Sequence, residues 1–137
     1  MTLLPTCTQS IRFRAFVLCL FAVAVCLTYG ILRNSFSGWW RQNGGGVPYV
    51  LFFITLAFTI FPTRRSILPI CLGTTLITSA LELLQLWKPE WLVEIRRTTA
   101  GAALLGSDFS WMDIPPYFIG GLLGWLLLTA LESSRQT

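Results

Sequence analysis

Four long apolar segments dominate the chain and alternate with short polar stretches. They extend over residues 11–32, 47–61, 66–87 and 114–131. A helix needs about 20 apolar residues to cross roughly 30 Å of hydrocarbon, and the first, third and fourth segments meet that length. The second is shorter and would need the glycine-rich residues before it or a thinner patch of bilayer. Since lipid offers no hydrogen-bond partners to unpaired backbone N–H and C=O groups, the pattern predicts helices. We therefore predict an all-α membrane protein, in which residues 1–137 form one compact bundle of four transmembrane helices.

The connection formed by residues 88–113 differs from the other loops, because it is too long for a turn and too apolar for a flexible linker. Trp91, Leu92 and Ile95 share one face of a predicted short helix. Such a helix suits the membrane interface, with the tryptophan ring at the level of the headgroups. The stretch Ala100–Leu105 is too short to cross the bilayer, so we expect it to dip into the bundle or to lie on it. An interfacial or re-entrant segment is therefore predicted between the third and fourth membrane helices.

The N-terminal region resembles a secretory signal, because Arg12 and Arg14 precede an apolar run. That run continues to about Leu32, which is longer than a signal core, and no clear small-residue cleavage site follows it. We therefore expect an uncleaved signal-anchor helix. The Lys and Arg residues divide equally between the two sides of the predicted topology. We nevertheless expect both termini in the cytoplasm, because Arg64 and Arg65 lie in a very tight loop and positive charges favour that side.

Composition supports a membrane location and argues against nucleic-acid binding. Apolar residues make up 54% of the chain and charged residues 12%, about half the charged fraction of a soluble domain. The ten Lys and Arg residues exceed the six Asp and Glu residues, but they occur singly or in pairs beside apolar segments. This distribution is typical of loops at a lipid surface. We therefore expect contact with the bilayer and none with nucleic acid.

The chain lacks histidine and has four isolated cysteines. The absence of histidine removes the commonest general base and the commonest metal ligand. None of Cys7, Cys19, Cys26 and Cys71 forms a Cys-x-x-Cys pair, so we interpret them as small apolar packing residues. No metal site and no cofactor are therefore expected.

Glu82 is the strongest candidate for a functional residue, because it lies within the third predicted membrane helix. A charge at the centre of such a helix costs roughly 2.5–3.5 kcal/mol and usually serves a function. Gln85 follows Glu82 by three residues and Thr78 precedes it by four, which places all three on one helical face. Two other interpretations stay open. Glu82 is close enough to the end of the helix to reach the headgroups, and a structural salt bridge to Arg96 or Arg97 would also account for it.

Three further charged residues complete the candidate polar cluster. Arg96 and Arg97 follow the predicted interfacial helix. An arginine at this level can bind a carboxylate or a lipid phosphate, or attract anionic lipid in general. Asp113 precedes the fourth membrane helix, in the spacing Ser110-x-x-Asp113 followed by two prolines. Because this pattern is typical of a helix N-terminus, we interpret capping as the main role of Asp113.

The fourth predicted membrane helix carries aromatic and small residues in informative positions. Trp111 and Tyr117, near its start, are interpreted as anchors at the membrane interface. Gly120 and Gly124 form a Gly-x-x-x-Gly motif, which allows close contact between helices. The contact can be with another helix of the same chain or with a second copy of the chain. A homo-oligomer through these glycines is therefore one of two predictions.

The segment 81–124 carries spaced residues that resemble one bacterial family. The matching motifs are Leu81-Glu82-x-x-Gln85, Pro89-x-Trp91-Leu92, Ile95-Arg96-x-Thr98, Gly101-x-x-x-x-Gly106, Phe109-x-Trp111-x-Asp113 and Tyr117-x-x-Gly120. They resemble the family catalogued as domain of unknown function 2809, which is similar to the VanZ-like membrane proteins. The resemblance implies a helical bundle in a bacterial cytoplasmic membrane, with Glu82, Gln85, Arg96 and Asp113 in one polar cluster. VanZ-like proteins are associated with glycopeptide tolerance and the cell envelope, which implies a role there without a defined reaction.

Three functions fit these features. We favour a binding protein that recognises an anionic lipid headgroup or a lipid-linked envelope precursor, because arginines and a carboxylate are predicted near one membrane face. An intramembrane enzyme that acts on a lipid-linked phosphate or ester would use Glu82 or Asp113 as its acid or base, but no nucleophile motif or metal cluster is recognisable. A small transporter or a subunit of a membrane complex would assemble through Gly120 and Gly124, although no internal repeat is visible.

Overall fold

The computed structural model describes residues 4–105 and 109–134, and helices form most of this part of the chain. The longer helices are α1 (Leu4–Leu32), α3 (Gly46–Ile60), α4 (Ile67–Leu84) and α7 (Ile114–Ser133). The shorter ones are α2 (Gly38–Asn43), α5 (Glu90–Arg97) and α6 (Thr99–Leu105). The described residues include no strand, so the all-α class is confirmed. Gly106 of the family motifs and the side chain of Cys7 lie outside the described residues.

Three segments of the described chain are long and apolar enough to cross a membrane. They are Ser10–Ser35, Arg64–Leu84 and Trp111–Ser133, and they correspond to the first, third and fourth predicted spans. The remaining apolar helix, α3, has 15 residues, which is about 22 Å of helix. The chain thus has three helices of spanning length and one shorter apolar helix, as expected of a membrane protein.

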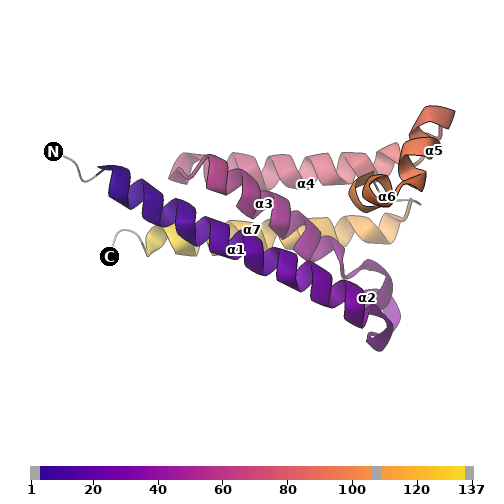
Figure 1. Ribbon diagram of the computed structural model, residues 1–137, viewed down its shortest axis with the longest axis horizontal. Coiled ribbons are helices and arrows are strands. Elements are labelled where there is room, and N and C mark those ends of the chain that lie inside the picture. Colours follow the sequence, from indigo (N-terminus) through magenta and orange to yellow (C-terminus); the bar gives the residue numbers. More distant parts are fainter. Residues whose placement is uncertain (1–3, 106–108, 135–137) are drawn as a thin grey trace.

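The four longer helices lie side by side, and consecutive ones run in opposite directions (Figure 1). α3 is central to the packing, since it contacts α1, α7 and α4. The start of α1 and the end of α7 lie at one end of the bundle, whereas α2, α5 and α6 lie at the other (Figure 1). We call this second end, formed by residues 33–45, 85–105 and 109–113, the loop end.

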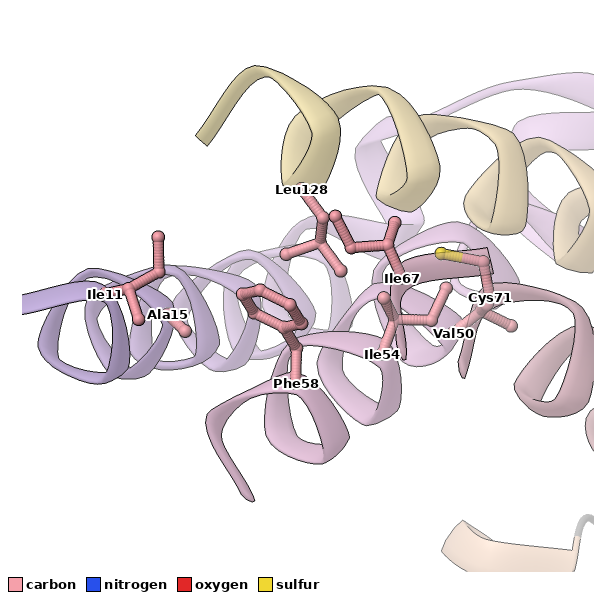
Figure 2. Packing of buried hydrophobic residues seen from close by; sticks show 8 residues of the cluster. All are labelled: Ile11, Ala15, Val50, Ile54, Phe58, Ile67, Cys71 and Leu128. Atoms are coloured by element: carbon pink, nitrogen blue, oxygen red, sulfur yellow. The ribbon is translucent and has the colours of Figure 1, made fainter. Parts of the chain in front are cut away.

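The apolar core lies nearer the opposite end of the bundle, where α1 begins and α7 ends. Ile54 and Phe58 of α3 are fully buried, and their side chains meet Leu128 of α7 between the helices (Figure 2). The other members of this cluster are Ile11, Ala15, Val50, Ile67 and Cys71. Large apolar side chains on the outer faces of the long helices are exposed, which is favourable where lipid surrounds the bundle. The loop end therefore depends more on polar contacts.

The third predicted span extends about one turn beyond the observed end of α4. α4 finishes at Leu84 rather than at residue 87. The next three residues form a tight turn, in which each N–H bonds to a carbonyl oxygen three residues earlier. Pro89 explains this end, because a proline disfavours the helical conformation of the residue before it. The first span, in contrast, extends beyond its prediction, since α1 already begins at Leu4.

The described part of the connection 88–113 contains α5 and α6, where one short helix was predicted. In α5, Leu92 is 3% exposed, whereas Trp91 and Ile95 are largely exposed. Of the three residues predicted to share one face, only Leu92 is buried. α6 lies on the bundle, because the Tyr49 hydroxyl of α3 donates a hydrogen bond of 2.8 Å to the carbonyl oxygen of Leu104.

α7 approaches α3 closely through its two spaced glycines. A Cβ atom at Gly120 would lie 2.9 Å from the carbonyl oxygen of Val47, and one at Gly124 would lie 2.8 Å from Cδ1 of Ile54. These distances leave no room for a side chain at the observed spacing of the helices. The Gly-x-x-x-Gly motif is thus a contact within one chain, and association of copies through it stays a prediction.

Candidate functional site

A buried hydrogen-bonded cluster occupies the loop end, and Glu82 in the last turn of α4 is its centre. Glu82 is 2% exposed. Its Oε1 atom accepts a hydrogen bond of 3.0 Å from the backbone N–H of Ser110. Its Oε2 atom accepts bonds of 3.0 Å from the Tyr117 hydroxyl and from the Gln85 amide nitrogen. Glu82 thus joins α4 to the start of α7 and to the turn before it.

Both simpler interpretations of Glu82 are wrong. The side chain is too deeply buried to extend to the headgroups. Within the described chain, neither Arg96 nor Arg97 pairs with it, because both guanidinium groups bind elsewhere. A buried carboxyl group is costly unless it is hydrogen-bonded, and three donors offset much of that cost. Glu82 is therefore held in place by polar partners that surround it.

Asp113 belongs to the same cluster. It occupies the N-cap position of α7, but its side chain makes no capping hydrogen bond. The Ser110 hydroxyl caps the preceding turn instead, by accepting from the N–H of Met112. The carboxyl group of Asp113 interacts electrostatically with that of Glu82. The side-chain amide of Asn43, with its nitrogen assigned toward Asp113, donates to Oδ1, and its oxygen then accepts from the indole of Trp39. This orientation is preferred because it satisfies both ends of the amide.

A cavity of about 330 Å³ opens beside the cluster, within the size range of small-molecule sites. Glu82, Gln85 and Asp113 line its polar part, and the rings of Tyr49 and Tyr117 line its sides. Residues 102–105 of α6 lie along another side. The cavity is therefore formed jointly by the long helices and α6. We call it the polar pocket.

Only one of the two polar atoms of the Gln85 side-chain amide has a hydrogen-bond partner among the described residues. The residue is 4% exposed and its amide nitrogen donates to Glu82, but no donor reaches its Oε1 atom from the described residues. Buried amide oxygens without a partner are uncommon, and each one calls for an explanation. Gln85 lies beside the polar pocket, but its Oε1 atom is itself buried, so a molecule in the pocket would reach it only after the amide turns toward the cavity.

Arg33 supplies a positive charge at the polar pocket. Its Nε atom donates a hydrogen bond of 3.0 Å to the carbonyl oxygen of Arg41, which fixes the guanidinium group beside the cavity. The side chain is exposed to solvent and interacts electrostatically with Asp113. The pocket thus combines hydrogen-bond acceptors in its interior with a cation where it meets solvent.

Arg96 and Arg97 have other positions. Arg96 is 8% exposed and donates to the carbonyl oxygens of Leu84 and Trp87, at 3.0 and 3.2 Å. These are orphan acceptors at the end of α4, so Arg96 closes that helix. Arg97 is exposed and forms an ion pair of 2.6 Å with Glu94 on the same helix. The structure brings Glu82, Gln85 and Asp113 together and leaves both arginines outside the pocket.

Comparison with known proteins gives one match. Residues 35–121 match a family described as protein of unknown function, DUF2809. The chain belongs to this family. The matched range contains every described partner of Glu82, whereas Arg33 and the whole of α1 precede it. No curated protein and no solved structure matches the chain. The DUF2809 description names no reaction.

Within the DUF2809 region, sequence analysis missed several residues of the site. Tyr117 was interpreted only as an interface anchor, and its hydrogen bond to Glu82 was not foreseen. Nothing in the sequence singles out Asn43 or Tyr49 as a site residue, because a polar residue in a loop and a tyrosine in an apolar helix are both common. Arg33 could have been noticed as a charge directly after a membrane helix, but only the structure brings it beside Asp113.

Proposed function

We propose that this protein binds the headgroup of an anionic lipid or of a lipid-linked envelope precursor in the polar pocket. The observation that carries the proposal is the lining of the cavity, where Glu82, Gln85 and Asp113 lie together with Arg33. Acceptors gathered beside a cation favour a ligand that brings its own N–H or O–H groups as well as a negative charge. The headgroup region of a bilayer is where such polar groups are abundant.

The chemistry of the pocket restricts the class of ligand that it would bind. Glu82, Asp113 and Gln85 present oxygen atoms, which favour hydroxyl or ammonium groups. Arg33 presents a guanidinium group, which favours a phosphate. We infer a phosphate-linked headgroup that also carries hydrogen-bond donors, with its phosphate near Arg33 and its donors toward the three acceptors.

The position of the pocket supports a headgroup ligand. Trp87, Trp91 and Trp111 are all exposed at the loop end, and tryptophan is enriched where a membrane meets water. In this proposal α3 crosses the membrane as the fourth span, in a locally thin patch, and α5 and α6 lie in the interface. The pocket would then open at the depth of the headgroups.

We further propose that the membrane is the bacterial cytoplasmic membrane and that both termini are cytoplasmic. The resemblance to bacterial VanZ-like proteins motivates the membrane, and an even number of crossings agrees with both ends lying at one side of the bundle (Figure 1). The pocket would face the cell envelope. A C-terminal tag should then resist protease in intact spheroplasts and be cleaved after lysis. Cleavage in intact spheroplasts would refute this topology.

Headgroup binding can be tested with two lipids that share the same acyl chains. Phosphatidylglycerol carries a phosphate and two hydroxyl donors, whereas phosphatidic acid carries a phosphate without the glycerol headgroup. We expect the purified protein to prefer phosphatidylglycerol in native mass spectrometry. Asp113→Asn should reduce that affinity about tenfold, the equivalent of one hydrogen bond to a charged group.

A pair of variants on α6 controls for general lipid adhesion. Ala102 lines the polar pocket and Ala100 does not. Ala102→Phe should fill the cavity and abolish the preference, whereas Ala100→Phe should retain it. Equal binding of both lipids by the wild type, or equal behaviour of the two phenylalanine variants, would contradict the proposal. Mass spectrometry of the lipids that co-purify then separates a phospholipid from a lipid-linked precursor.

A further inference from the structure

An apolar groove lies between α3 and α4 and has a volume of about 270 Å³. Phe53, Leu56, Ala57 and Ile60 line it from α3, and Thr74 and Ile77 line it from α4. The spacing of these residues places each set on one face of its helix. The side chains of Ala57 on α3 and Thr74 on α4 are small, and the groove is the space that they leave between the two helices. The groove is thus a property of two facing helix surfaces.

The groove adjoins the polar pocket. Tyr49, Thr78 and Leu81 line both of them. Tyr49 marks the junction, because its hydroxyl binds the backbone of α6 beside the pocket. Thr78 uses its hydroxyl within α4, where it donates to the carbonyl oxygen of Thr74 at 2.9 Å. A second apolar cavity, between α4 and α7, shares no lining residue with the polar pocket.

The groove is long enough to hold one acyl chain. From Tyr49 to Ile60 the α3 wall rises about 16 Å, and the acyl chains of one leaflet fill half of a hydrocarbon core that is roughly 30 Å thick. Leu56, Ile60 and Ile77 along the groove are exposed, so the groove is open at its side to the surrounding lipid. An acyl chain could enter from that side without a rearrangement of the helices.

We propose that one acyl chain of the bound lipid lies in this groove while its headgroup occupies the polar pocket. This inference rests on the proposed function and extends it, because it makes the ligand a whole lipid and not only a headgroup. The donors and the phosphate of the lipid then face the polar pocket, and its apolar chain faces the adjoining groove. Recognition depends on the chain as well as on the headgroup.

The test compares long-chain and short-chain ligands with one headgroup. Dioleoyl phosphatidylglycerol can occupy both pocket and groove, whereas the dihexanoyl lipid is too short to fill the groove. We expect the wild type in detergent to bind the dioleoyl lipid about tenfold more tightly, because only the long chain packs along both walls. Affinities are measured by native mass spectrometry.

Ala57→Phe and Thr74→Phe fill the groove from its two walls. Each should remove the preference for the long chain and leave the affinity for the dihexanoyl lipid unchanged. Ala24→Phe is the matched control, because Ala24 is an exposed position on α1 outside the groove, and it should behave as wild type. Thermal unfolding without added lipid shows whether each variant is folded.

The outcomes separate the groove from the pocket. A long-chain preference that persists in folded Ala57→Phe and Thr74→Phe would overturn the groove, even where Ala102→Phe abolishes binding of both lipids. Binding of neither lipid to the wild type would overturn the proposed function and the groove together. Loss of the preference in Ala24→Phe as well would also reject the groove, because the effect would then not depend on its walls.

Discussion

Replacing Glu82 with alanine is expected to lower the free energy of unfolding by about 3 kcal/mol. The variant removes the common acceptor of three hydrogen bonds, whose donors are Ser110, Tyr117 and Gln85. Each donor would then stay buried without its partner, and the end of α4 and the start of α7 would lose this shared contact. The measurement is equilibrium unfolding of the detergent-solubilised protein in sodium dodecyl sulfate, followed by tryptophan fluorescence.

Two further variants show that the effect comes from the buried acceptor. Glu94→Ala removes an exposed carboxylate whose ion pair with Arg97 lies at the surface, and such pairs contribute about 0–1 kcal/mol. Glu82→Gln keeps one acceptor oxygen and should have an intermediate effect. If Glu82→Ala unfolds at the same denaturant concentration as Glu94→Ala, the cluster does not stabilise the loop end.

Gly120→Leu is expected to destabilise the bundle by about 3 kcal/mol, because overpacking a close helix contact forces the backbones apart. A Cβ atom at Gly120 would meet the carbonyl oxygen of Val47 at 2.9 Å and Cβ of Val50 at 3.0 Å. Neither neighbour can move away by a simple side-chain rotation. The same unfolding assay measures the loss.

Gly73→Leu is the matched control, since a Cβ atom at Gly73 of α4 would have no other heavy atom within 4 Å. Its free energy of unfolding should change by no more than about 0.5 kcal/mol. Gly124→Leu should lie between the two, because its nearest neighbour is the flexible end of Ile54. Equal stability of Gly120→Leu and Gly73→Leu would show that α3 and α7 do not need this close approach.

The helices could be predicted because lipid sets simple requirements for length and composition. Three of the four predicted spans correspond to helices of spanning length. The second was recognised as short, and α3 has 15 residues. The break between α5 and α6 falls at Thr98, whose backbone is extended and whose hydroxyl accepts a hydrogen bond from the N–H of Gly101 in α6. This break was not predicted from the sequence, although threonine is a common N-cap residue.

Residues of the site were predicted only where their polarity is unusual for their place in the sequence. Glu82 was found because a carboxylate is rare in an apolar helix, and Gln85 because it shares that helical face. Asp113 was noticed mainly as a capping residue, since a capping sequence looks the same whether its carboxylate binds the helix or faces a pocket. Arg96 was grouped with the cluster by the family resemblance, while the structure assigns it to the end of α4.

The hydrogen bonds of Glu82 have a consequence for the order in which the protein is made. Its partners Ser110 and Tyr117 follow it by 28 and 35 residues, so α4 is synthesised well before either donor exists. During insertion Glu82 has only Gln85 of its three partners, and the cluster can close only when the start of α7 arrives. The polar pocket is therefore one of the last parts of the molecule to assemble, and a nascent chain that stops before residue 110 would lack it.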